Sequence, residues 1–189
     1  MSNSCVITNE EGWYKKALDT DLARPKFAIM NPEITYTLPD YQTQCGCADI
    51  MMHTMERYFV LEDTMEITDK IAQDVMKNVM KYAKILKKDP ENYEARAEIM
   101  WCGSLSHNGL TGCGTCGGDW ATHLIEHELG GMFDVAHGAG LAAVWGSWAR
   151  YVMDEKPERF AQFAVDVMGV EESDDVKSTA LKGIEAVEE

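Results

Sequence analysis

The sequence predicts a mainly α-helical fold preceded by a short segment of strands and loops. Apolar residues recur at helical spacing from Ala48 to near the C-terminus. Three of the five prolines lie within the first 45 residues, and short turn signals divide the rest of the chain. We therefore expect residues 1–45 to form a lead-in segment and residues 46–189 to form one α-helical domain.

The lead-in segment contains two candidate strands. The apolar run Lys26–Met30 is closed by Asn31-Pro32, a pair that is typical of turns. Cys5–Thr8 is a second run of the same kind. We expect both runs to form short strands.

Three helices are expected in the first half of the helical domain. The middle one carries apolar side chains on one face, and proline forbids its continuation beyond Asp89-Pro90. The three predicted helices are Asp49–Phe59, Thr64–Lys88 and Asn92–Leu105.

A glycine-rich turn, Gly109–Gly118, opens the second half. Asp119 is a predicted N-cap for a helix that runs through Leu129 and ends at Gly130-Gly131. Three further helices follow, at His137–Val152, Glu158–Met168 and Asp174–Val187.

Composition and charge limit the classes of partner. The 189 residues are 46% hydrophobic and 26% charged, as in ordinary globular proteins. The net charge of −15 repels phosphate backbones and anionic lipids, so we expect no nucleic-acid or membrane partner. Met1–Cys5 shows no secretory signal, and the six cysteines fit reduced thiols in the cytoplasm.

Two clusters of side chains suit a metal ion. Asp49 and His53 are four residues apart on a predicted helix, so both can reach one ion. His123, His127 and His137 form the second cluster, in a chain that has five histidines. Imidazoles with one carboxylate suit Fe(II), Zn(II), Co(II) or Ni(II). The spacing alone favours His123 and His127 as a ligand pair.

Three other motifs compete with this interpretation. His123–His127 fits H-x-x-E-H, the inverted zincin motif, with Glu126 as base. Gly112–Gly117 fits G-x-G-x-x-G, but a predicted helix precedes it where a dinucleotide site needs a strand. Four cysteines offer a structural zinc site, although their inner spacings are irregular for that class. These are Cys45, Cys47, Cys113 and Cys116.

Three blocks make the sequence recognisable. Ala48–Tyr58, Gly118–Leu129 and Asp134–Leu141 closely resemble the iron-dependent (group III) alcohol dehydrogenases, nearest to their butanol dehydrogenase branch. The blocks occur in family order, and the resemblance covers nearly the whole chain. It implies the helical metal-binding fold of that family, like the C-terminal domain of dehydroquinate synthase.

The resemblance also implies roles for particular residues. The family's metal ligands fall on Asp49, His53, His123 and His137, with Fe(II) as the first metal and Zn(II) as the second. His127 would lie near the nicotinamide and the substrate as a catalytic residue and would not be a ligand. This differs from the spacing argument, which pairs His123 with His127.

Family members begin with a Rossmann-like domain that supplies most NAD(P) contacts. The 189 residues of this sequence show no pattern of a Rossmann-like domain, so we expect the metal-binding half alone, as a fragment or a natural truncation. The implied activity is that of an iron-type alcohol dehydrogenase or aldehyde reductase acting on small primary alcohols or aldehydes, with impaired NAD(P) binding.

Other functions remain open at this point. One is a Lewis-acid lyase, isomerase or hydrolase that uses no nicotinamide. Another is a non-catalytic subunit, and a third is the inverted zincin. We also expect a homo-oligomer, a dimer, because loss of a partner domain exposes apolar surface. Candidates for such a surface, with core packing as the alternative, are Trp13, Tyr14, Phe27 and Tyr36.

Overall fold

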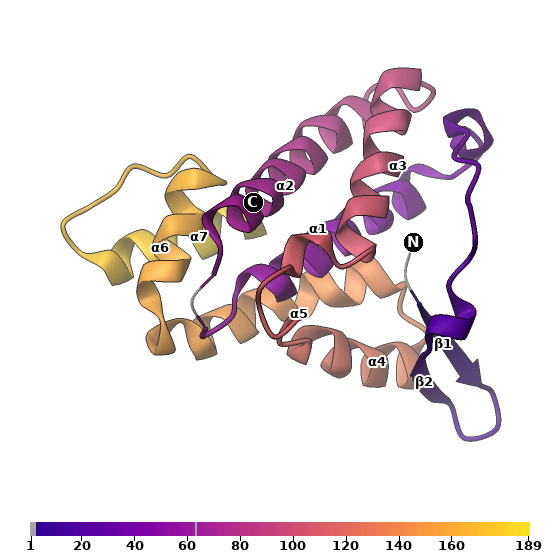
Figure 1. The fold of residues 1–189 in the computed structure, drawn as a ribbon, viewed down its shortest axis with the longest axis horizontal. Helices are drawn as coiled ribbons and strands as arrows, with labels where there is room; N and C mark the ends of the chain where they lie inside the picture. The colour runs from indigo at the N-terminus through magenta and orange to yellow at the C-terminus, as the bar shows by residue number, and fades with distance from the viewer. Residues whose placement is uncertain (1–2, 63) are drawn as a thin grey trace.

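The computed structural model describes residues 3–62 and 64–189, which contain seven α-helices and a two-stranded sheet (Figure 1). The mainly helical fold class predicted from the sequence is confirmed. The sequence predicts no secretory signal at Met1–Cys5, and the first two of these residues lie outside the described residues. The helices are α1 (Asp40–Tyr58), α2 (Glu66–Leu86), α3 (Tyr93–His107), α4 (Ala121–Phe133), α5 (His137–Val152), α6 (Pro157–Asp166) and α7 (Val176–Glu188).

The sheet is an N-terminal hairpin. β1 (Ser4–Asn9) pairs antiparallel with β2 (Tyr14–Asp19), which confirms the strand predicted at Cys5–Thr8. The strand predicted at Lys26–Met30 is wrong, because this segment is irregular and pairs with no strand among the described residues. An apolar run alone does not make a strand when no edge is available for its backbone hydrogen bonds.

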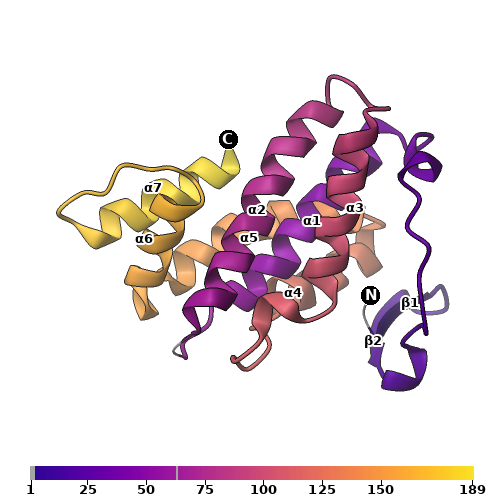
Figure 2. The ribbon, with the colours of Figure 1, turned by 45° about the horizontal axis from the view of Figure 1, so that its top comes forward.

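Helix α1 lies at the centre of the domain and contacts α2, α3 and α5 (Figure 1). Helices α6 and α7 pack against each other at the end of the domain away from the hairpin (Figure 2). The core side chains include Met55 and Tyr58 of α1, Trp145 of α5 and Phe163 of α6, all at most 2% exposed. Each such side chain contributes about 1.5–3 kcal/mol by burial.

The observed helix ends differ from prediction most at α1 and α4. α1 begins at Asp40, directly after Pro39, so the boundary expected after residue 45 lies inside this helix. Short 3₁₀ turns at Asp21–Ala23, Pro32–Thr35, Leu110–Gly112 and Met153–Glu155 complete the chain. None of the described helices is long and apolar enough to cross a bilayer.

Helix α4 continues through the glycines that were expected to end it. Gly130 and Gly131 lie inside α4, which ends at Phe133. A Cβ atom at Gly131 would lie 2.6 Å from the backbone oxygen of Trp13, and one at Gly130 would lie 2.8 Å from Nζ of Lys15. These glycines therefore let the hairpin approach α4, which explains their presence better than helix termination does.

The first turn of α5 packs closely against α1. A Cβ atom at Gly138 would overlap the backbone carbonyl of Cys45, and one at Gly140 would lie 2.7 Å from Cγ of Glu126. The small residues bring the start of α5 against both α1 and α4. His137, the first residue of α5, is therefore held beside the polar side chains of α1.

Candidate metal centre

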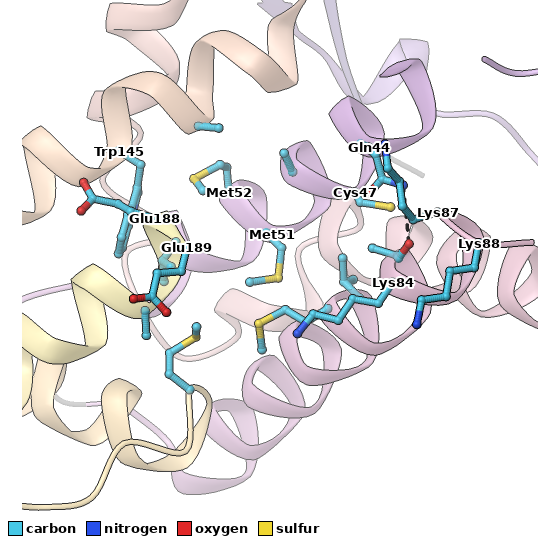
Figure 3. Close-up of a pocket in the computed structure, with 18 residues that line it drawn as sticks. Gln44, Cys47, Met51, Met52, Lys84, Lys87, Lys88, Trp145, Glu188 and Glu189 are labelled. Atoms are coloured by element: carbon cyan, nitrogen blue, oxygen red, sulfur yellow. Dashed lines mark hydrogen bonds between the residues drawn. The ribbon is translucent and has the colours of Figure 1, made fainter. Parts of the chain in front are cut away.

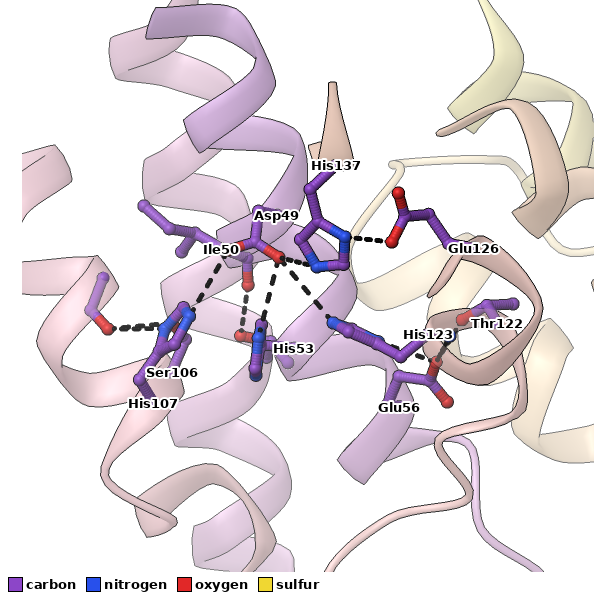
Figure 4. Close-up of polar contacts among 12 residues, drawn as sticks. Asp49, Ile50, His53, Glu56, Ser106, His107, Thr122, His123, Glu126 and His137 are labelled. Carbon is purple, nitrogen blue, oxygen red and sulfur yellow. Dashed lines mark hydrogen bonds and ion pairs between the residues drawn. The ribbon is translucent and has the colours of Figure 1, made fainter. Parts of the chain in front are cut away.

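The side chains predicted as metal ligands meet at one point beside α1 (Figure 4). Asp49 and His53 project from successive turns of α1. His123 lies in the first turn of α4, and His137 begins α5. Three helices thus bring together one carboxylate and three imidazoles.

The three imidazoles surround a single oxygen atom, Oδ1 of Asp49. The Nε2 atoms of His53, His123 and His137 lie 3.6, 3.7 and 3.4 Å from it. Ligand atoms about 2.1 Å from a tetrahedral ion lie about 3.4 Å from one another. These separations fit ligands that share one cation.

Two of these atoms have no hydrogen-bond partner although they are buried. They are Oδ1 of Asp49 and Nε2 of His123. Buried polar atoms are nearly always paired, so an unpaired carboxylate oxygen facing an unpaired imidazole nitrogen indicates a missing cation. The donor set of three imidazoles and one carboxylate suits divalent iron or zinc.

A buried carboxylate orients His123 from behind. Oε1 of Glu56 accepts a hydrogen bond from Nδ1 of His123 at 3.0 Å and from its backbone N–H at 3.1 Å. The same oxygen accepts a hydrogen bond from the Thr122 hydroxyl. Because Nδ1 donates to Glu56, Nε2 keeps its lone pair and points it at Asp49.

A second carboxylate orients His137 in the same way. Oε2 of Glu126 contacts Nδ1 of His137 and accepts a hydrogen bond from Nζ of Lys15 at 3.0 Å. The Glu126 side chain is fully buried. Its oxygens are thus engaged by two cationic or donor groups, and it is not free to activate water. Glu126 is therefore unsuited to act as the catalytic base that the inverted zincin interpretation requires.

Glu126, His127 and His137 form another group whose ligand atoms lie within 4.8 Å of one another. The ammonium of Lys15 lies against this group and contacts both Glu126 and Nδ1 of His137. A positive charge therefore already lies against two of the three side chains of this group. The Asp49 cluster is therefore the better site.

Burial and hydrogen bonding set the protonation of the cluster. Burial alone would raise the pKa of Asp49, but the neighbouring imidazoles of His107, His123 and His53 outweigh it and hold the pKa well below its usual value. Burial lowers the pKa of His53 to about 2. Burial would also lower the pKa of His123, but Asp49 and Glu56 raise it. An ionised carboxylate and a neutral imidazole are the forms that bind metals.

One histidine of the cluster was missed by sequence reasoning. His107, in the last turn of α3, places Nε2 at 3.4 Å from Oδ2 of Asp49, the carboxylate oxygen not shared by the other three rings. Its ring packs against that of His53, tilted by 33°, with centroids 3.7 Å apart. It has no partner at metal-ligand spacing in the sequence, so no pattern pointed to it.

His127 lies one turn beyond His123 and faces His137, with ring centroids 5.6 Å apart. It forms no ion pair with Asp49 among the described contacts. The expectation from spacing, that His127 pairs with His123 on one ion, is therefore not supported by the geometry. Burial, helped by the charge of Lys15, lowers the pKa of His127, which leaves a neutral, half-buried imidazole.

The cysteines and the glycine-rich turn do not form competing sites. Among the described residues, the groups with metal-ligand geometry include no cysteine. Burial raises the pKa of the Cys47 thiol to about 11, which disfavours the thiolate that zinc needs. Gly112–Gly117 begins at the last residue of a 3₁₀ turn and precedes no helix directly, so it lacks the strand-to-helix context of a dinucleotide site.

A cavity of about 640 Å³ lies on another side of α1 (Figure 3). Met51, Met52 and Trp145 form part of its apolar wall, and Lys84 and Glu188 lie at its edge. None of the histidines lines it. It is therefore separate from the metal cluster.

Comparison with known proteins identifies relatives along the whole chain. The model of the C-terminal region of the Fe-containing alcohol dehydrogenase family matches residues 43–189. The crystal structure of NADH-dependent butanol dehydrogenase A from Thermotoga maritima superposes with a TM-score of 0.95 at 38% identity. That match covers 100% of this chain and 46% of the Thermotoga chain.

Curated relatives show the same partial coverage. NADH-dependent butanol dehydrogenase A of Clostridium acetobutylicum is 36% identical over 100% of this chain and 49% of its own length. NADPH-dependent aldehyde reductase YqhD of Escherichia coli is 34% identical over 90% of this chain and 44% of its own length. The chain thus spans about half the length of the curated relatives it matches.

Proposed function

Since this chain belongs to the Fe-containing alcohol dehydrogenase family, we propose that it forms the metal-binding part of an oxidoreductase acting on small primary alcohols and aldehydes. The observation that carries the proposal is the convergence of three imidazoles on Oδ1 of Asp49. The names of the relatives, butanol dehydrogenase and aldehyde reductase, support the substrate class. In this proposal, residues 46–189 are the metal-binding unit, and residues 1–45 are a lead-in that contacts it through Lys15.

The proposed ligands are Asp49, His53, His123 and His137. Fe(II) is the first candidate because of the family, and Zn(II) is the second because the same donors suit it. When bound, such an ion supplies Lewis acidity to the alcohol or carbonyl oxygen of a substrate.

The chain's own side chains prepare the site and move the proton. Glu56 and Glu126 hold the rings of His123 and His137 so that both Nε2 atoms face Asp49. His127 is neutral at pH 7 because its pKa is lowered, so it can accept the proton that the alcohol releases. Its partial exposure lets it pass this proton to water.

Hydride transfer also needs a nicotinamide, and the names of the relatives specify NADH or NADPH. In the described residues the glycine pattern Gly112–Gly117 is a turn without the geometry of a pyrophosphate loop. The 189 residues by themselves therefore bind metal and aldehyde but support weak or no NAD(P)-linked turnover.

The proposed assembly is a homodimer in the cytoplasm. Trp13, Tyr14 and Phe27 are 57%, 62% and 77% exposed, so they offer apolar area for a second copy. Tyr36, the fourth candidate, is half-buried and contributes less. The six free cysteines fit a reducing compartment.

The test uses the purified 189-residue chain loaded with Fe(II) without oxygen. Butyraldehyde and NADH or NADPH are added, and the absorbance of the reduced nicotinamide is followed. We expect stoichiometric metal that is lost in Asp49→Ala, with slow or undetectable turnover. Turnover equal to that of full-length relatives would contradict weak cofactor binding. Conversion of aldehyde without nicotinamide would favour a Lewis-acid lyase or isomerase, and a chain that binds no metal would favour a non-catalytic subunit.

A further inference from the structure

Each proposed imidazole ligand from α4 or α5 is held by a side chain that is not itself a ligand. Glu56 lies behind His123, and Glu126 lies behind His137. Such outer partners fix the orientation of a ligand and strengthen metal binding. A carboxylate ligand needs the same support, because its free oxygen otherwise lets the group rotate away from the ion.

His107 is placed to give that support to Asp49. Figure 4 shows His107 on the side of the carboxylate that faces away from His123 and His137. Its Nε2 lies 3.4 Å from Oδ2, whereas the other rings face Oδ1. Oδ1 of Asp49 therefore faces the three proposed imidazole ligands, whereas Oδ2 faces His107.

The contacts of the His107 ring are compatible with Nε2 as its donor toward Asp49. A donor at Nε2 of His107 fits this position, because Oδ2 of Asp49 lies 3.4 Å away and a carboxylate oxygen can accept. The buried hydroxyl of Ser106 lies 2.7 Å from Nδ1 and donates to the carbonyl oxygen of Gly103 at 3.0 Å. Rotated toward the ring, the same hydroxyl donates to Nδ1 and leaves the ring proton on Nε2. The carbonyl oxygen of Gly103 lies 2.9 Å from the same Nδ1.

We propose that His107 is the positioning residue of Asp49, donating from Nε2 to Oδ2 and keeping Oδ1 directed at the three imidazoles. Its ring also packs against that of His53, a second proposed ligand, with centroids 3.7 Å apart and planes inclined by 33°. The role extends the proposed function, because it rests on Asp49 being a metal ligand. His107 is not itself a ligand in this account.

The experiment compares Co(II) binding by variants of the 189-residue chain, using competition with a chelator and the visible absorption of bound Co(II). His107→Leu removes the donor, and we expect the Kd to rise about 10–100-fold, as for other outer partners of metal ligands. At saturating Co(II) the band positions should equal those of the wild type, because the ligands are unchanged. His107→Gln keeps an N–H donor and should restore the Kd to within about threefold of the wild type.

The controls separate this role from folding and from the metal site itself. Gln44→Leu removes a half-buried polar side chain that lines the separate cavity and whose described hydrogen bonds go to Asp40 and Ala83, and its Kd should stay within about threefold. Circular dichroism of each metal-free variant reports folding, and His107→Ala replaces His107→Leu if the latter unfolds.

Equal Kd values for the wild type and the apolar His107 variants would overturn the positioning role. Shifted Co(II) bands at saturation would overturn it too, since they would make His107 a ligand. Failure of the wild-type chain to bind Co(II) would instead refute the proposed metal site.

Discussion

Replacing Glu56 measures how strongly metal affinity depends on the group behind His123. Oε1 of Glu56 accepts hydrogen bonds from Nδ1 of His123 at 3.0 Å, from its backbone N–H at 3.1 Å and from the Thr122 hydroxyl. Glu56 is 2% exposed, so water cannot replace these bonds. Hydrogen bonds to a charged acceptor contribute about 1.5–3 kcal/mol each. The carboxylate thus fixes both the ring and the first turn of α4.

Two substitutions divide its effect into charge and position. Glu56→Gln keeps an oxygen acceptor but loses the charge, so we expect metal binding to weaken about tenfold, or about 1.4 kcal/mol. Glu56→Ala removes all three acceptor contacts and frees the ring of His123. We expect a loss of about 100-fold, which lies at the upper end for an outer partner.

The assay is competition between the protein and a chelator for Zn(II) or Co(II), with Tm measured on the metal-free variants. Glu66→Gln is the matched control, because Glu66 is an exposed residue of α2 and its loss changes the net charge equally. An affinity of Glu56→Ala within about threefold of the wild type would refute the view that Glu56 orients a ligand.

Three further predictions concern packing, charge and the second carboxylate. A methyl group in Gly138→Ala would overlap the Cys45 carbonyl. This variant should therefore lose about 1–3 kcal/mol of stability and bind metal less tightly. An unchanged Tm and Kd would contradict this close packing. Burial would raise the pKa of Asp69, but its buried ion pair with Arg159 lowers it. This pair therefore stabilises the fold above the unfolded pKa of about 3.9, and it stops doing so as pH falls through the lower folded pKa. Asp69→Asn should therefore cost about 3 kcal/mol at pH 7 and much less near pH 2, and an equal cost in chemical denaturation at both pH values would disprove the linkage. Glu126→Gln should weaken metal binding about tenfold by loosening the imidazole it holds, whereas unchanged affinity would argue that this contact has no role at the site.

The helices could be predicted from sequence where local signals agreed with packing. His137–Val152 was predicted with its observed bounds, because a glycine break precedes it and its apolar spacing is regular. Lys26–Met30 has the composition of a strand, but pairing depends on a distant edge that local sequence does not specify. Gly130-Gly131 was interpreted as a helix end because the approach of the hairpin cannot be read from neighbouring residues.

Some residues of the candidate site could likewise be predicted from the sequence, and others could not. Asp49, His53 and His123 follow from helical spacing alone, whereas the choice of His137 over His127 came from the family resemblance. Spacing on α4 favoured His127, but only the first turn of that helix faces Asp49. His107 had no sequence signal, because its role arises from the packing of α3 against α1.

The central claim is that Asp49 and the three imidazoles share one cation. Its most direct test is the anomalous scattering of crystals of the chain loaded with Fe(II) or Zn(II). We expect one peak, about 2.0–2.2 Å from Oδ1 of Asp49 and from Nε2 of His53, His123 and His137. A peak bound instead by the Cys113 and Cys116 thiols, or by Glu126 with His127, would contradict it.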